Sequence, residues 1–285
     1  MSQSLRHIKS RIRGIESTKK LTKAMEMVSI AKLKKMEKIL GNSNFYFLKV
    51  EEFLKNVLST AEGINNPYLR QPKAQGGRVL LCIVASDTGL CGTYNQNILR
   101  AAEKFLQKFD KNSIDLVVVG RKGFSYFKRK GYEVKHSFLG FNGRYSDALS
   151  EKILNTLTGM FLSGEVDEVY LAYTKIESAS RYKIVLEKFL NISYVKDTKK
   201  EYIFEPGQES ILKKLLPMFI SNKLKVVLLN AFNSEHQARA VSMGGATKNA
   251  IELLEAMILL RNKMRQANIT REIMEVISSA EALKG

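Results

Sequence analysis

The chain has 285 residues, 45% of them hydrophobic and 26% charged, and a formal net charge of +18. This length can bury one full core and a second, narrower interface. No run of eighteen uncharged apolar residues occurs, which argues against a membrane-spanning segment. The N-terminus lacks the apolar core of a secretory signal peptide. Cys82 and Cys91 have neither metal-ligand nor disulfide-framework spacing, as is typical of a reducing compartment.

Residues 1–62 are predicted to form a long amphipathic helix. Apolar side chains recur at three- or four-residue intervals towards both ends of the first forty residues, at Leu5, Ile8, Ile12, Ile15, Leu33, Met36 and Leu40. We call the helix positions at this spacing the seam. Between the two ends the seam is polar and the apolar residues spread over other faces, so we expect several neighbours to enclose the middle of the helix. Gly41–Asn44 has the composition of a turn. Because apolar spacing resumes after it, either a second helix or a continuation ends near Ala61.

Positive charge is concentrated at the start of the chain. Residues 1–40 hold eleven basic and three acidic side chains. Such a face suits an acidic protein, nucleic acid or lipid surface, and a solvated helix face is the simpler alternative. No aromatic residue precedes Phe45, which argues against a platform for single-stranded nucleic acid. No long zipper follows that would grip duplex DNA.

The middle of the chain, residues 78–195, alternates short apolar runs with helical patterns. Strands are predicted at Val79–Ala85, Asp115–Gly120, Tyr132–Phe138, Val166–Tyr173 and Ile184–Ser193, and helices at Asn95–Phe109, Lys122–Lys130 and Ala148–Phe161. Alternating strands and helices favour a mostly parallel sheet covered on both faces. We therefore predict an α/β domain here.

Residues 207–285 are predicted to be helical throughout, starting at Gln208, with Pro217 marking a kink or a boundary. A seam of alternating four- and three-residue steps is formed by Ala246, Ala250, Leu253, Met257, Leu260, Met264 and Ala267. Two amphipathic helices at opposite ends of a chain most simply bury each other. We expect an antiparallel coiled coil.

Candidate catalytic features are weak. The loop Ser86–Gly92 follows a predicted strand, where open sheets bind phosphates, but its spacing matches no phosphate-binding fingerprint and suggests a tight turn. Ser234–His236 contains triad residue types, yet adjacent helix positions cannot converge. We expect Ser234 to cap a helix start, Cys82 to lie in the core, and Cys91 to be exposed in its loop. No metal-ligand spacing occurs, so we predict no catalytic residue, cofactor or metal.

Five stretches of the sequence carry a distinctive pattern: KLTKAMEMVSIAKLKK (20–35), SDTGLCGTYNQN (86–97), VVGRKG (118–123), SEHQARAVSMGGATKNA (234–250) and RQANITREIMEVISSA (265–280). Together they resemble the gamma subunit of F-type ATP synthases in order, spacing and total length. The chain departs from the family's usual pattern at Gly41 and at Met243–Gly245, where glycines in a helix cost about 1 kcal/mol each relative to alanine.

The resemblance implies an α/β fold with a long antiparallel coiled coil of the N- and C-terminal helices and a central Rossmann-like domain. It implies a non-catalytic rotor of the central stalk, which couples ion flow through a membrane ring to ATP synthesis or hydrolysis. The implied partners are the alpha and beta subunits of the catalytic head, an epsilon-type stalk subunit and the membrane rotor ring, with no nucleic acid. The implied location is the cytoplasmic face of the bacterial inner membrane, as a peripheral protein.

The family's coupling and bearing positions fall on Met25, Arg239, Gln266, Thr270 and Glu272 of this sequence. Each has a simpler interpretation. Met25 could be ordinary packing, since methionine commonly fills gaps. Thr270 and Glu272 could belong to a solvated helix face. Arg239 could form a structural ion pair with Glu235, four residues earlier.

Two other classes of function remain open from the residues. A basic coiled-coil adaptor would bind nucleic acid or an acidic membrane face, with an affinity that falls steeply with salt. An enzyme built on the central domain would retain nucleotide in the isolated chain.

Overall fold

The computed structural model describes residues 2–59, 66–70, 77–110, 113–178, 181–192, 205 and 207–282. The chain forms two compact units. The helical unit comprises Met1–Val28 and Ala240–Gly285, and the α/β unit comprises Ser29–Arg239. Two long helices, α1 (Ser2–Ser59) and α5 (Gln208–Ala282), contribute to both units. The predicted fold class, two long terminal helices with a central α/β domain, is confirmed. The predicted ranges 1–62, 78–195 and 207–285 remain a prediction.

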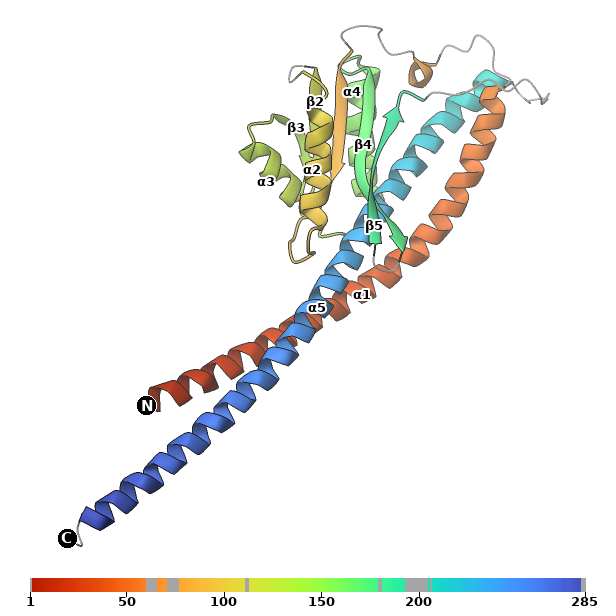
Figure 1. The fold of residues 1–285 in the computed structure, drawn as a ribbon. Coiled ribbons are helices and arrows are strands. Elements are labelled where there is room, and N and C mark those ends of the chain that lie inside the picture. The colour runs from red at the N-terminus through yellow and green to blue at the C-terminus, as the bar shows by residue number, and fades with distance from the viewer. Residues whose placement is uncertain are drawn as a thin grey trace. The chain divides into compact units, whose positions relative to one another are not determined.

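The α/β unit is built on a five-stranded sheet with the order β3-β2-β1-β4-β5 (Figure 1). The strands are β1 (Val79–Val84), β2 (Ile114–Val119), β3 (Val134–Phe138), β4 (Glu168–Ser178) and β5 (Arg181–Leu190). The first four in spatial order are parallel, and β5 runs antiparallel to β4 at the edge. The mostly parallel sheet is thus confirmed. The end of the last predicted strand, Ser193, lies outside the described residues.

Helices cover both faces of this sheet. One face carries α2 (Tyr94–Leu106) and α3 (Arg121–Arg129), and the other carries α4 (Asp147–Leu162) together with the parts of α1 and α5 that belong to this unit. The central strand β1 divides its side chains by alternation: Leu80, Cys82 and Val84 join the α4 side, and Val79, Leu81 and Ile83 join the α2 side. All of β1 is buried, as expected of a strand covered on both faces.

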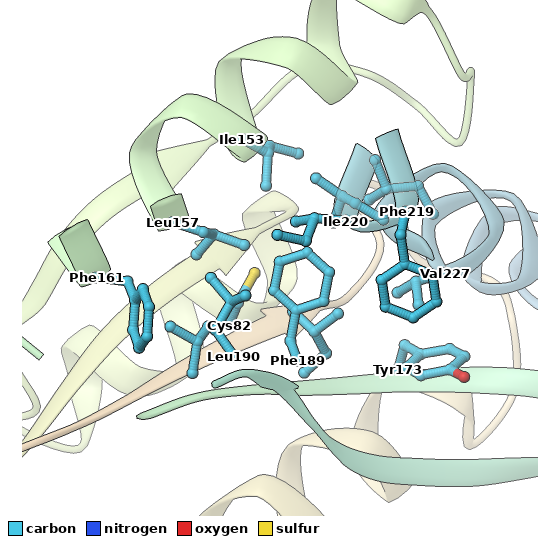
Figure 2. Close-up of a cluster of buried hydrophobic side chains, with 14 of the residues drawn as sticks. Cys82, Ile153, Leu157, Phe161, Tyr173, Phe189, Leu190, Phe219, Ile220 and Val227 are labelled. Carbon is cyan, nitrogen blue, oxygen red and sulfur yellow. The ribbon is translucent and has the colours of Figure 1, made fainter. Parts of the chain in front are cut away.

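The larger core lies between the sheet, α4 and α5. Figure 2 shows Ile153, Leu157 and Phe161 of α4 above the sheet, with Phe219 and Ile220 of α5 beside them. The predicted core position of Cys82 is confirmed, and burial raises the pKa of its thiol to about 12. This core fixes the first half of α5 on the sheet, and a short 3-10 turn at Pro67–Leu69 precedes β1.

The predicted turn in α1 is wrong, and so is one of the two alternatives predicted for Pro217 in α5, the boundary. The turn at Gly41–Asn44 is absent because α1 continues without a break to Ser59. Pro217 is no boundary, because it lies inside α5. An interior proline costs about 3 kcal/mol and a glycine about 1 kcal/mol. Buried neighbours on both helices offset these costs, among them Met36, Val50, Leu54, Leu215, Leu216, Phe219 and Ile220.

The helical unit is an antiparallel pair. Thr22 Oγ1 and Thr247 Oγ1 share a hydrogen bond of 2.9 Å. One turn later on α1, the Glu26 carboxyl group lies 3.6 Å from the point where Gly244 would carry a Cβ. Rising numbers on α1 thus meet falling numbers on α5. The double glycine at 244–245 does not break α5.

The seam of α1 follows the prediction, whereas that of α5 follows it at only some of the predicted positions. Ile8, Ile12, Thr22 and Ser29 are buried as expected. On α5 the most buried positions are Met243, Thr247 and Ala250, followed by half-buried Leu254, Met257, Met264 and Asn268, while the predicted Leu253 and Leu260 are exposed. Ala250, Met257 and Met264 are therefore buried or half-buried as predicted. At Ala246, Leu253, Leu260 and Ala267 the next residue along the chain is more buried than the predicted one. Apolar residues on both sides of the seam, such as the pair 253–254, leave its phase undetermined by the sequence.

By length and composition alone, α5 contains a stretch apolar enough to cross a membrane, and 61% of that stretch is buried inside the protein. Burial of this extent is typical of the core helix of a globular protein.

Candidate coupling sites

The five predicted coupling residues lie in three separate places. Met25 is half-buried on α1 in the helical unit. Gln266, Thr270 and Glu272 are exposed near the end of α5 in the same unit. Arg239 is buried at the edge of the α/β unit. The five residues therefore form no single site.

Met25 belongs to a polar stretch of the helical pair. Its neighbours Thr22 and Glu26 face Thr247 and Gly244 of α5. Close by on α1, Met27 and Val28 are exposed, at 56% each. A helix that buries threonine and exposes methionine and valine presents apolar surface outward, which is the signature of an interaction surface.

Gln266 and Thr270 are four residues apart and share one face of α5, whereas Glu272 points away from it. At 1.5 Å per residue, Gln266 lies about 28 Å and Thr270 about 35 Å beyond Thr247 along the helix. From Ile269 to Ala282 every residue is exposed, including the apolar Ile273, Met274, Val276 and Ile277. We call residues 269–282 the tip.

Arg239 reaches back from α5 into the loop that follows β1. Its Nε donates to the carbonyl of Gly89 at 3.2 Å. One terminal nitrogen donates to Thr88 Oγ1 at 2.9 Å and to the Thr88 carbonyl at 3.2 Å. The same nitrogen donates to Glu235 Oε1 at 2.8 Å, so the alternative of a structural ion pair is confirmed. The other terminal nitrogen lies 3.4 Å from His236 Nδ1.

Glu235 and His236 share this environment, and each is only 1% exposed. Burial raises the pKa of the Glu235 carboxyl group, while the positive charge of Arg239 opposes that rise. His236 Nε2 lies 2.9 Å from the carbonyl of Gly143, in the loop after β3. Burial is the main reason that the His236 pKa is lowered to about 4; the hydrogen bond to Gly143 opposes this shift, and the charges of Lys32 and Arg239 add to it. The imidazole is therefore neutral at physiological pH and donates to the Gly143 carbonyl.

Gln237 completes the ring of polar contacts, because its Nε2 donates to the carbonyl of Ser178 at the end of β4. We call Glu235, His236, Gln237 and Arg239 the collar. Ser234 beside it does not cap a helix start, contrary to our prediction. It lies inside α5, and its hydroxyl donates to the Asn230 carbonyl at 2.8 Å.

The collar occupies the place where an open α/β sheet usually holds its ligand. The connections from β1 and from β3 leave on opposite sides of β1, so the switch point lies at the carboxyl ends of β1 and β4. There Tyr94 is fully buried, its hydroxyl donating to the Ala231 carbonyl of α5 at 3.1 Å and accepting from Thr174 of β4. The position is thus filled by the protein's own helix.

The glycine-containing loop after β1 therefore binds α5 and is not a phosphate-binding loop. Cys91 within it is buried, contrary to our expectation, and accepts from Asn95 Nδ2 at 3.2 Å. Burial raises the pKa of its thiol, which opposes a nucleophilic role. Within the described part of the chain, no group of three or more His, Cys, Asp or Glu side chains could hold a metal ion.

The four-residue spacing in the sequence indicated the pair of Glu235 and Arg239 but not the rest of the collar. A signal was present: the stretch 233–239 is polar at every position except Ala238, inside a helix that is otherwise rich in apolar residues. Buried polar side chains need partners, and those partners lie up to 151 positions away, in the case of Thr88. Spacing within α5 could not reveal them.

The ligand position of the α/β unit is filled by the protein's own long helix, and the helical unit exposes apolar side chains. These two features define a class of helical assembly subunits. The family model described as ATP synthase matches residues 4–283. Two ATP synthase gamma chains are similar throughout: that of Protochlamydia amoebophila is 35% identical and that of Anaeromyxobacter is 37% identical, each with 99% of both chains covered. The chain belongs to the ATP synthase gamma chain family.

Solved structures agree. A chain in the central stalk and c-ring structure of the Tetrahymena thermophila mitochondrial ATP synthase is 25% identical, with a TM-score of 0.61, and covers 79% of this chain and 99% of that chain. A chain of the Euglena gracilis mitochondrial ATP synthase, 16% identical with a TM-score of 0.66, shares the fold over 99% of this chain and 95% of that chain. Gamma chains are non-catalytic stalk subunits of a membrane-associated complex.

Proposed function

We propose that this chain is the rotor of an F-type ATP synthase and couples ion flow through a membrane ring to ATP synthesis or hydrolysis in the surrounding subunits. The observation that carries this proposal is similarity to ATP synthase gamma chains along the whole length. The filled ligand position of the α/β unit supports it, because α5 occupies the place where such sheets usually bind a ligand. Coupling then consists of holding partner sites in different states.

The proposed partners are the alpha and beta subunits of the catalytic head, an epsilon-type stalk subunit and the membrane rotor ring. The net charge of +18 suits acidic loops on such partners and would steer their association. The matching relatives from Protochlamydia amoebophila and Anaeromyxobacter are bacterial chains. We accordingly propose the cytoplasmic face of the bacterial inner membrane as the location, with the chain held there through its partners.

Four of the predicted coupling residues fit a surface that faces partners. Met25 lies beside the exposed Met27 and Val28, and Gln266, Thr270 and Glu272 lie at or near the tip. We propose that Met25 belongs to a bearing and that the three residues on α5 contact the catalytic head. Arg239 fits a different role, because its guanidinium group is enclosed by its own unit.

Isolation of the native complex through a tag on this chain tests the proposal. We expect catalytic-head subunits to co-purify in moderate salt, and an ATPase activity that drives ion pumping when the complex is returned to vesicles. The alternative, a basic adaptor, predicts instead the recovery of nucleic acid or acidic lipid, lost steeply as salt rises. Recovery of the chain without any nucleotide-binding partner would refute the rotor proposal.

A further inference from the structure

The collar differs from the rest of the α5 interface in its chemistry. Below it, α5 packs on the sheet through apolar side chains such as Leu224, Val227 and Leu228. Apolar attraction has no direction, so such packing resists separation of the helix but only weakly resists its rotation about its own axis. Hydrogen bonds weaken steeply when their angle is distorted. A set of them around a helix therefore fixes its rotation.

The collar has this arrangement. Successive helix positions differ by about 100°, so Glu235, His236 and Gln237 point in three directions, and Arg239 returns to the side of Glu235. Their contacts accordingly end on three different segments: the loop after β1, the loop after β3 and the end of β4.

These segments are also bound to one another. Asp87, next to Thr88, accepts hydrogen bonds from the backbone amides of Arg121 at 3.0 Å, Gly140 at 3.0 Å and Asn142 at 2.7 Å. One carboxylate thus joins the loops that follow β1, β2 and β3. Any displacement of Thr88 by Arg239 is therefore shared by the loops that follow these three strands.

Glycines at this edge permit the close approach. Gly120 has a φ of +98°, and a Cβ there would stand 2.2 Å from the Ala85 carbonyl oxygen. Gly143 has a φ of +65°, and a Cβ there would stand 2.7 Å from His236 Nε2. Both positions lie in the left-handed region, which L side chains avoid. Gly143 thus lets the loop after β3 approach α5, and Gly120 lets the loop after β2 approach the end of β1.

We propose that Arg239 is a positioning residue of the rotor: it and the collar fix the rotation of α5 against the α/β unit, so that torque passes between them. The α/β unit ends at Arg239, so the collar is the last part of α5 that this unit holds. Arg239 thus acts through Thr88, Gly89 and Asp87 rather than by contact with a partner subunit. This inference rests on the proposed rotor function.

The first arm of the test needs only the purified full chain. Arg239→Gln should accelerate amide hydrogen exchange in residues 86–92 and 139–144 by at least about tenfold. Loss of the guanidinium group and its hydrogen bonds leaves both loops free to open locally. Lys213→Gln is the matched control: it breaks an exposed i,i+4 pair with Glu209 on the same helix, and should change neither loop. Unchanged exchange in Arg239→Gln would overturn the inference, whatever the chain's function.

A second variant covers the case in which Arg239→Gln does not fold. Thr88→Val removes only the hydroxyl acceptor of a side chain that is itself exposed, so the fold should survive. We expect faster exchange in residues 86–92 by a smaller factor than in Arg239→Gln. Exchange identical to that of the wild-type chain would contradict the proposal that the collar holds this loop.

The second arm uses the assembled complex. For Arg239→Gln and Thr88→Val, the ratio of ions pumped to ATP hydrolysed should fall by a larger factor than the rate of ATP hydrolysis, while Lys213→Gln keeps the wild-type ratio. A merely structural residue would lower both together with the yield of complex. Faster loop exchange with an unchanged ratio would overturn the torque role. If the wild-type chain supports no coupled complex, the proposed function fails. The hydrogen-exchange measurements then still decide whether the collar holds the loops.

Discussion

Two regions of α5 depart from the usual distribution of side chains in opposite ways. Around residues 230–239 the helix buries polar groups, including Asn230, Glu235 and Arg239. At the tip it exposes apolar groups, including Ile273 and Val276. Most polar side chains of the first region form hydrogen bonds within their own unit, whereas Asn233 Oδ1 and Gln237 Oε1 are buried without a partner among the described residues. Among the described residues, no other segment of the helical unit buries the second. One helix thus combines a region that buries polar groups within its own unit with a region that exposes apolar groups.

The comparison separates two kinds of functional residue that look alike in a sequence. A buried charge with a full set of hydrogen bonds constrains its own unit, and removing a partner leaves an uncompensated charge. An exposed apolar stretch contributes little to the unit that carries it, and gains its stabilisation only when another surface covers it. The free energy of unfolding of the isolated chain distinguishes the two kinds. Substitutions in the collar should change it, and substitutions in the tip should not.

The largest effect is expected for Glu235→Leu. Arg239 would remain buried without its carboxylate partner, and breaking a buried pair typically costs about 3–5 kcal/mol. Urea denaturation of the purified chain measures the change. The exposed pair of Glu209 and Lys213 provides the control, since Glu209→Leu should cost less than about 1 kcal/mol. Equal effects at the two sites would show that the collar is not internal.

A pH dependence follows from His236. Its folded pKa of about 4 lies below the ordinary value of 6.5, so between these two values the unfolded chain binds a proton that the folded chain does not. The contribution of His236 to the free energy of unfolding is therefore fully present above pH 6.5. It is lost as the pH is lowered towards 4, by about 3 kcal/mol in total. The charged groups near the ring are Lys32 of α1 and Glu235 and Arg239 of α5.

Urea denaturation at several pH values between 4 and 7 measures this slope. His236→Gln, which retains a donor for the Gly143 carbonyl, should flatten the slope attributable to this ring. A slope that is the same in both chains would assign the dependence to other groups.

Met25→Lys should have an intermediate effect. Met25 is half-buried, so an ammonium group there is partly desolvated, at an expected cost of about 1 kcal/mol to the isolated chain. The exposed Met27→Lys is the control, with no measurable cost. In the assembled complex the new lysine would seek a carboxylate on the surrounding subunits, and that bond must break in each rotary step.

For Met25→Lys we therefore expect ATP hydrolysis to survive, ion pumping to fall disproportionately, and the defect to grow on cooling. Pumping and hydrolysis are measured on the same vesicles. Equal losses of both in a properly assembled complex would show that Met25 only fills space.

The smallest effect on the isolated chain is expected at the tip. Replacing Ile273, Val276 and Ile277 by serine should change the free energy of unfolding by less than about 0.5 kcal/mol, because these side chains are already exposed. Yield and activity of the assembled complex should nevertheless fall, though not to zero. A loss of stability in the isolated chain would mean that the tip folds against its own unit. Full assembly would mean that no partner covers it.

The sequence alone determined the features that depend on pattern over many residues. The alternation of apolar runs and helical periods specified the order of strands and helices, and the first seam identified Ile8 and Ile12 as buried. Four-residue spacing on a helix was enough to suggest the pair of Glu235 and Arg239. These features rest on backbone periodicity, which each segment carries in its own residues.

Only the tertiary structure decided the features that depend on which surface a segment meets. Local signals placed a turn at Gly41–Asn44, a boundary at Pro217 and a cap at Ser234, and each signal is weaker than the burial of neighbouring side chains, so the helices continue. The collar could not be foreseen for a related reason. A buried polar group is tolerated where hydrogen-bond partners await it, and the partners of Arg239 come from a loop distant in sequence.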